Sequence, residues 1–263
     1  AVILGRDTRI SGQMFESALQ AGFTSAGVDV VLAGCIPTPA VAYLTKSMRL
    51  TAGIVISASH NSYQDNGIKF FDGNGNKLPD QIERTIECTF NDHSFYNTNT
   101  TLGKVNNLND AAGRYIEFCK RTFPTQLSLR GLHIIVDAAH GASSGVIEAV
   151  LKELGAKVTS VASSPNGVNI NKNVGTTFPE NIAKAIINFS GDFGIALDGD
   201  GDRFLVVDEK GRIFQGDELL YSTAKDMVRV KGVNNVQGVV GTLMSNFGLE
   251  KSFQNMGLEF RRS

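Results

Sequence analysis

The sequence has no tryptophan, only 3 cysteines and only 6 prolines among its 263 residues. Cys35, Cys88 and Cys119 are odd in number and far apart, which favours reduced thiols over a disulfide framework or a zinc site. The low proline content beside 28 glycines favours tight turns in an ordered fold over a flexible linker.

The chain also lacks a strong net charge and a long apolar run. Its formal net charge is -1, so neither a basic surface for nucleic acid nor a polybasic membrane patch is indicated. No apolar stretch reaches the roughly 18 residues of a membrane-spanning helix, and no signal-peptide pattern opens the chain. We therefore expect a cytoplasmic globular protein with no nucleic-acid partner and no membrane partner.

A pattern of strand, helix, glycine and strand occurs three times, beginning at AVILGRD, at HIIVDAAHG and at GVVGT. This repetition predicts an α/β fold made of three-layer α/β/α units with mixed, mostly parallel sheets and right-handed crossovers. We place the units at residues 1–130, 131–235 and 236–263. The third unit stops after its second strand and the first begins inside a strand, so we expect the sequence to be part of a longer protein.

Finer features are predicted within the first unit. PTPAVAYLTKSM is typical of a helix, AGIVIS of a buried strand and DNGIKFFDGNGNKLP of a hairpin region. The Asn66-Gly67 pair indicates a type I′ turn. The asparagine-rich residues 91–109 predict a long surface loop, followed by a helix from Asp110 to about Arg121.

Three aspartates alternate with glycine in LDGDGDR, between two stretches that are typical of strands. We call residues 198–203 the aspartate loop. Alternate spacing turns the carboxylates of Asp198, Asp200 and Asp202 toward one point, and Gly199 and Gly201 permit the unusual backbone that this requires. Oxygen ligands without cysteine or histidine favour Mg²⁺ over zinc. The adjacent Arg203 can hold phosphate oxygens, which points to phosphate chemistry.

Two other interpretations of the aspartate loop fit the sequence less well. A calcium EF-hand would account for Glu209, but Arg203 stands where its loop requires glycine, and the flanks are predicted strands rather than helices. A merely solvated acidic turn fits two Asp-Gly steps better than three aspartates in strict alternation after an apolar strand.

A polar cluster ends the apolar strand of the first unit, where α/β sheets place their functional sites. In SASHN, residues 57–61, the Ser59 hydroxyl beside His60 could accept a phosphoryl group. On composition alone, a polar turn after a strand explains the same residues.

The pairing of these two loops is specific. ISASHN followed by DNGIK and later by LDGDGDR resembles the α-D-phosphohexomutase superfamily, with GRDTR, PTP and VDAAHGA in matching order. GVNIN and VGTLMSN are most similar to its bacterial phosphoglucosamine mutase branch.

The resemblance implies a role for each matching residue. Ser59 would cycle through phosphoserine, with an oxygen on one Mg²⁺ per chain, and the metal ligands would be Ser59, Asp198, Asp200 and Asp202. Lys69 and Arg9 would transfer protons and steady the phosphate. His60 and Arg203 would support the serine phosphate, and Arg6 is a further candidate for binding phosphate or substrate.

The activity implied is the interconversion of glucosamine 6-phosphate and glucosamine 1-phosphate, with glucose or glucosamine 1,6-bisphosphate as activator and intermediate, feeding UDP-N-acetylglucosamine and cell-wall synthesis. A homodimer is compatible with the sequence. The sugar-reading and distal phosphate loops of the family have no match here, so the 263 residues alone are expected to be inactive. The alternatives are a phosphomannomutase/phosphoglucomutase, or a non-catalytic metal-binding α/β module.

Overall fold

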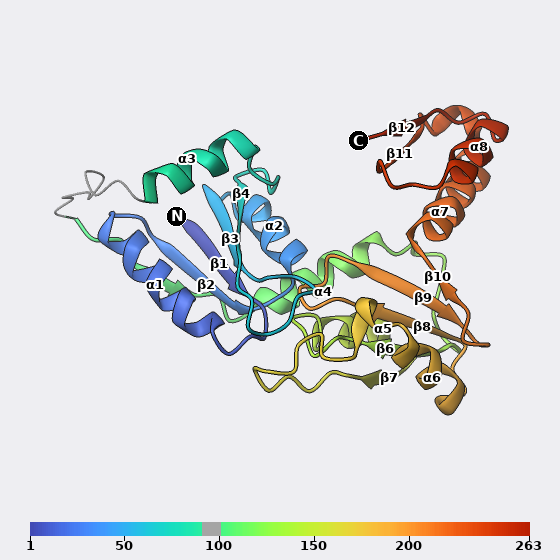
Figure 1. Cartoon of the computed structure of the whole chain (residues 1–263), viewed down its shortest axis with the longest axis horizontal. Helices are drawn as coiled ribbons and strands as arrows, with labels where there is room; N and C mark the ends of the chain where they lie inside the picture. Colours follow the sequence, from blue (N-terminus) through green and yellow to red (C-terminus); the bar gives the residue numbers. More distant parts are fainter. Residues whose placement is uncertain (91–100) are drawn as a thin grey trace.

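The computed structural model describes residues 1–90 and 101–263. They form two five-stranded sheets and one two-stranded sheet, arranged in chain order (Figure 1). Within these ranges no helix combines the length and the apolar character needed to cross a membrane.

The first sheet has the strand order β4-β3-β1-β2-β5, and only the β3–β4 pair is antiparallel. Helix α1 covers one face, while α2 and the start of α4 cover the other. The bounds of its elements are β1 Val2–Arg6, α1 Gly12–Ser25, β2 Val30–Cys35, α2 Thr38–Ser47, β3 Ala52–Ile56, β4 Ile68–Asp72, α3 Asp80–Phe90, β5 Val105–Asn107 and α4 Ala111–Thr122.

The second sheet repeats this topology. Its order is β10-β9-β8-β6-β7. When the strands of each unit are counted along the chain, the first four lie side by side in the order fourth, third, first, second in both sheets. In both, the fourth strand is antiparallel to the third. Helices α5 and α6 pack on opposite faces. The bounds are β6 His133–Asp137, α5 Val146–Glu153, β7 Lys157–Val161, the 3-10 turn Gly175–Thr177, α6 Glu180–Phe189, β8 Phe193–Leu197, β9 Phe204–Asp208 and β10 Ile213–Phe214.

The last part of the chain is a parallel pair, β11 Val239–Gly241 and β12 Phe260–Arg262, joined by α8 Phe247–Asn255. Leu249 and Phe253 of α8 are buried together with Ala224 of α7, Gly216–Lys231. A 3-10 turn, Val233–Asn235, follows α7. Because α7 shares this core, packing of the third unit begins before residue 236. The boundaries at 130 and 235 stay predictions.

Helix α4 lies between the first two units and packs on α2 of one and α5 of the other. Tyr43 of α2 stacks on Phe118 of α4 with ring centroids 4.1 Å apart. Offset aromatic pairs of this kind add to the stability of the apolar area that they bury. The connection between the units is therefore a packed element rather than a free linker.

The repeated units and the mixed, mostly parallel sheets are confirmed, but two local predictions are wrong. Neither Asn66 nor Gly67 has positive φ, which a type I′ turn requires; the tight turn lies instead at Gly75, with φ 78°. β5 lies inside the predicted 91–109 loop because its backbone pairs with β2. Residues 91–100 of that loop lie outside the described ranges.

Two glycines allow α2 to lie close to the first sheet. A Cβ atom on Gly53 of β3 would stand 2.1 Å from Thr45 Oγ1, and one on Gly5 of β1 would stand 2.4 Å from Val41 Cγ2. Thr45 is itself fully buried and donates its hydroxyl to the Val41 carbonyl, so it has no room to move away. Any side chain at Gly53 therefore pushes α2 away from β1 and β3.

Gly53→Ala is predicted to lower the midpoint of urea denaturation, because overpacking a closed core costs about 1–3 kcal/mol. Gly22→Ala is the matched control, since the exposed Gly22 lies within α1 with nothing within 4 Å of a new Cβ. Alanine should stabilise that helix by about 0.5–1 kcal/mol. Equal midpoints for the two variants would show that the packing of α2 on β3 does not require glycine at position 53.

Candidate active site

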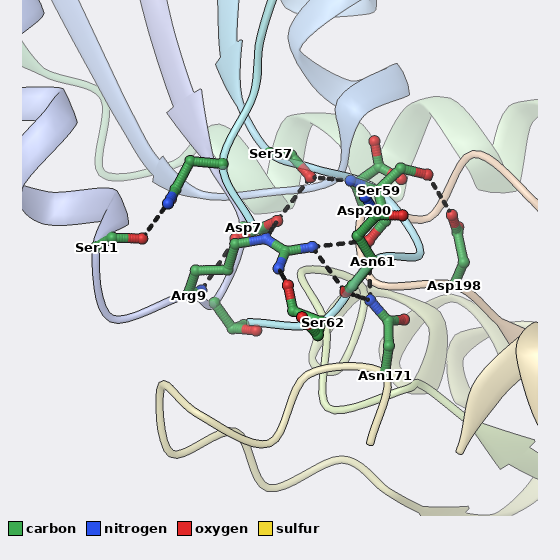
Figure 2. A network of polar contacts seen from close by, with 12 residues as sticks. Asp7, Arg9, Ser11, Ser57, Ser59, Asn61, Ser62, Asn171, Asp198 and Asp200 are labelled. Atoms are coloured by element: carbon green, nitrogen blue, oxygen red, sulfur yellow. Dashed lines mark hydrogen bonds and ion pairs between the residues drawn. The ribbon is translucent and has the colours of Figure 1, made fainter. Parts of the chain in front are cut away.

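Two loops from different units meet at the carboxyl ends of their sheets. The serine loop, residues 57–62, follows β3, and the aspartate loop follows β8. Each therefore leaves the third strand of its repeat and returns through an antiparallel fourth strand. Ser59 Oγ donates a hydrogen bond to Asp198 Oδ2 at 2.8 Å, as Figure 2 shows. The candidate nucleophile and the aspartates predicted from the sequence are thus brought together.

The three aspartates of the loop point toward one position. Asp198 and Asp200 are 0% and 1% exposed, Asp202 is more open, and one carboxylate oxygen from each lies within 4.8 Å of the others. Asp198 Oδ1 accepts the backbone N–H groups of Asp202 and Arg203, both at 3.1 Å. This turn fixes the orientation of the first carboxylate.

The two glycines of the loop serve different purposes. Gly201 has φ 71°, as the sequence predicted. Gly199 does not have positive φ, but a Cβ there would stand 2.8 Å from the Ser59 carbonyl oxygen, so a small residue is needed for the approach of the serine loop. The expectation of unusual backbone at Gly199 is therefore wrong.

The carboxylates are not electrostatically equivalent. Burial, together with the charge of Asp200, raises the pKa of Asp198 to about 6. Burial alone would also raise the pKa of Asp200, but hydrogen bonds from Lys69 and Thr38 outweigh it and lower that pKa. Asp200 is thus held as the anion, while Asp198 resists ionisation unless positive charge is near.

The residues present fit a divalent cation. Asp200 Oδ2 accepts hydrogen bonds, whereas its buried Oδ1 has no partner within the described ranges. A buried oxygen without a partner is costly, and a cation beside it would remove that cost. The donor set contains only carboxylate and hydroxyl oxygens, which hard ions such as Mg²⁺ prefer. When bound, Mg²⁺ would draw charge from a phosphoryl oxygen.

Lys69 reaches the aspartate loop from β4. Its Nζ lies 2.6 Å from Asp200 Oδ2 and 3.3 Å from Asp202 Oδ2. Burial would lower the pKa of Lys69, but the hydrogen bonds and charges of the two aspartates outweigh it and raise the pKa. Lys69 therefore holds its proton, which suits a group that offsets phosphate charge or donates a proton.

A buried network lies beneath the serine loop. Ser59 has φ 51°, its N–H donates to Ser57 Oγ at 2.9 Å, and Ser57 Oγ donates to Asp7 Oδ2 at 2.6 Å. Arg9 is 2% exposed and pairs with Asp7 at 2.9 Å. Its guanidinium also donates to the carbonyls of Ser59, Asn61 and Ser62. These contacts favour a positioning role for Arg9 over the proton transfer that the resemblance implies.

The remaining predicted residues, His60, Arg203 and Arg6, differ in their burial and in their partners. His60 is half-buried beside Ser59, and its Nδ1 is buried with no hydrogen-bond partner among the described residues. The Arg203 side chain is 59% exposed and lies 3.9 Å from Asp202. Arg6 is instead paired with Glu16 of α1 at 3.2 Å. His60 and Arg203 thus border the site, whereas Arg6, at the end of β1, is tied to α1.

Sequence reasoning missed two residues that join the units. Thr38, in the PTP motif, donates its hydroxyl to Asp200 Oδ2 at 2.6 Å and its N–H to the Asp200 carbonyl at 2.9 Å. Asn171, in GVNIN, donates to the carbonyls of Ser59 and Asn61, both at 2.9 Å. Both motifs contribute to the family resemblance, but no local pattern shows which loop a side chain will meet across an interface.

Comparison with known proteins places the fold and loops in one family. "Phosphoglucomutase/phosphomannomutase, alpha/beta/alpha domain I" matches residues 1–97, and the corresponding domain II matches residues 113–211. The chain belongs to the phosphoglucomutase/phosphomannomutase family. The α-D-phosphohexomutase resemblance is therefore confirmed.

Curated relatives of this family match the chain throughout. The phosphoglucosamine mutases of Janthinobacterium sp. (strain Marseille) and Burkholderia mallei (strain SAVP1) are both 54% identical over 262 residues. These alignments cover 100% of this chain and 58% of each relative. The chain thus spans somewhat more than half the length of the relatives that it matches.

Solved structures agree on the fold. A phosphoglucomutase/phosphomannomutase family protein from Burkholderia thailandensis has a TM-score of 0.85 at 27% identity, covering 99% of this chain and 57% of that one. A putative phosphomannomutase from Thermus thermophilus has a TM-score of 0.86 at 23% identity, covering 100% and 60%. The family's repeated α/β/α architecture is shared over the whole chain.

Asp200→Asn should weaken Mg²⁺ binding at least about tenfold, or about 1.4 kcal/mol. The carboxylate of Asp200 has one oxygen for Lys69 and Thr38 and a second for a cation, whereas an amide has only one oxygen. Isothermal titration calorimetry with MgCl₂ measures the affinity. Glu209→Gln, which removes the same charge from an exposed position on the next turn, is the control and should leave it unchanged. Unchanged affinity in Asp200→Asn would remove this carboxylate from the metal site.

Proposed function

We propose that the protein to which these residues belong is a phosphoglucosamine mutase that interconverts glucosamine 6-phosphate and glucosamine 1-phosphate through a phosphoserine at Ser59. The observation that supports this most directly is the Ser59 hydroxyl, which lies on a left-handed loop 2.8 Å from the first aspartate of a three-carboxylate cluster. The similarity of the whole chain to proteins named phosphoglucosamine mutase, at 54% identity, supports the choice of sugar.

The reaction would proceed in two phosphoryl transfers. In the first, a sugar hydroxyl oxygen bonds to the phosphorus of phosphoserine as the bond to Ser59 Oγ breaks. The sugar gives up its hydroxyl proton, and Ser59 Oγ regains one. The product, a 1,6-bisphosphate, turns over. Ser59 Oγ then bonds to the phosphorus of the other phosphoryl group as the bond from that phosphorus to the sugar oxygen breaks; Ser59 Oγ loses its proton, the sugar oxygen gains one, and the isomeric monophosphate is released. Holding the groups in line supplies much of the rate.

Each residue has a task in this scheme. The aspartate loop, with Ser59, would hold one Mg²⁺ beside the phosphate. Lys69, as the protonated amine, offsets the charge on the moving phosphoryl group and can return a proton to the leaving oxygen. His60 and Arg203 border the serine and are proposed to steady its phosphate. Arg9 is proposed to hold the serine loop in place through hydrogen bonds to its carbonyls.

The broader setting is proposed on the same basis. The activity would feed UDP-N-acetylglucosamine and cell-wall synthesis in the cytoplasm. Glucose or glucosamine 1,6-bisphosphate would prime the serine. Assembly as a homodimer stays a prediction.

Ser59→Ala should abolish transfer of ³²P from labelled glucose 1,6-bisphosphate to the protein and lower mutase turnover by about 10³-fold or more, because the acceptor oxygen is gone. Ser62→Ala is the control, since its side chain is exposed three residues away on the same loop. Phosphopeptide mapping by mass spectrometry locates the label. Normal labelling of the Ser59→Ala protein would identify a different acceptor.

Sugar choice is tested by a coupled assay of the full-length protein on the 1-phosphates and 6-phosphates of glucosamine, glucose and mannose. We expect kcat/KM for the glucosamine phosphates to be at least about tenfold higher, which contacts to one substituent can supply. Higher kcat/KM on mannose or glucose phosphates would assign the phosphomannomutase/phosphoglucomutase alternative.

A further inference from the structure

Asn171 crosses from the second unit to the backbone of the serine loop. It lies between β7 and the 3-10 turn at Gly175–Thr177, with φ 57°, and its own N–H donates to the Ala139 carbonyl at 2.9 Å. Its Nδ2 donates to the carbonyls of Ser59 and Asn61, each at 2.9 Å (Figure 2). The left-handed backbone aims the amide, and the amide holds two carbonyls of a different unit.

The Ser59 peptide is consequently held from both sides of the interface. The first unit supplies Ser57 Oγ to its N–H at 2.9 Å and Arg9 Nη2 to its carbonyl at 3.1 Å. The second unit supplies Asn171 Nδ2 to the same carbonyl. A non-glycine residue at φ 51° is disfavoured on its own, so surrounding contacts must maintain it.

The amide of Asn171 also packs directly against the aspartate loop. A Cβ on Gly199 would stand 2.7 Å from Asn171 Nδ2 and 2.8 Å from the Ser59 carbonyl oxygen. The Ser59 carbonyl, the Asn171 amide and the Gly199 backbone thus occupy one close-packed junction. Moving the amide would change the separation between the serine loop and the aspartates.

We infer that Asn171 is a positioning residue for phosphoryl transfer, which couples the serine loop to the aspartate loop and holds Ser59 Oγ in line. This inference rests on the proposed phosphoserine function of Ser59. Asn171 acts through the backbone of the serine loop, so its loss should lower the rate of transfer rather than the affinity for sugar. Groups that orient a reactive centre from one step away contribute about 10–100-fold.

The test is the single-turnover rate of Ser59 phosphorylation by glucose 1,6-bisphosphate in the full-length protein with saturating Mg²⁺. Asn171→Gly deletes both donors while glycine keeps the left-handed backbone without strain. Asn173→Gly is the matched control, because Asn173 has φ 56° on the same loop and is exposed, with no side-chain hydrogen bond among the described residues. We expect Asn171→Gly to slow phosphorylation about 10–100-fold and Asn173→Gly to leave it unchanged.

A second variant separates hydrogen bonding from shape. Asn171→Asp keeps the size of the side chain and its tolerance of left-handed backbone, but turns carboxylate oxygens toward two carbonyls. It should be at least as slow as Asn171→Gly, while KM for the bisphosphate stays within about twofold of the wild-type value. A wild-type rate in Asn171→Asp would show that shape alone matters and would overturn the inference.

The remaining outcomes are distinct from a failure of the proposed function. If the wild type is labelled on Ser59 and Asn171→Gly matches its rate, the positioning role is wrong. If Asn171→Gly and Asn173→Gly slow the reaction equally, the slowing comes from a disturbance of the whole loop and the positioning role of Asn171 is wrong. If the wild type carries no label on Ser59, the phosphoserine function fails and the positioning role fails with it.

Discussion

Three carboxylates held within 4.8 Å of one another, two of them buried, are the constraint on which the reactive centre depends. Mutual repulsion and burial both oppose their ionisation, as the raised pKa of Asp198 shows. The surroundings supply positive charge and donors: Lys69 from β4, Thr38 from α2 and backbone amides within the loop. Since Lys69 and Thr38 belong to the other unit, the charge balance of the loop also fixes the interface.

The two functional loops occupy the same position in a repeated fold. Each connects the third strand of its sheet to an antiparallel fourth strand, at the carboxyl edge. One copy carries the hydroxyl and the other carries the anions. Placing the two edges against each other produces a site that neither repeat could form alone, and Gly199 makes the approach close enough for Ser59 to reach Asp198.

Features encoded within one short stretch were predictable from the sequence. The repeats follow from local periodicity, and the convergence of Asp198, Asp200 and Asp202 follows from their alternation. Arrangements set by tertiary contact were not. β5 exists because β2 offers an unpaired edge, and the Asn66-Gly67 turn is overridden where Ser57 N–H donates to the Gly67 carbonyl.

The same distinction applies within the candidate site. The roles of Ser59 and Lys69 are predicted by the resemblance of their motifs to a known family, not by local pattern alone. For Arg9 the resemblance implies proton transfer, because nothing in its motif reveals that three loop carbonyls surround its guanidinium. Thr38 and Asn171 act on partners more than a hundred residues away in the chain. Such pairs appear only when the two units are docked.

The packing of α4 has a mechanical consequence. This helix is wedged between α2 and α5, and the units are further tied by Thr8 to the His140 carbonyl and by the Ile10 N–H to the Gly167 carbonyl. A joint braced at several separated points resists bending about any single axis. The hydroxyl and the anions should therefore move together as one rigid block, so that the distance between Ser59 Oγ and Asp198 is set by the packing of the two units and not by a hinge between them.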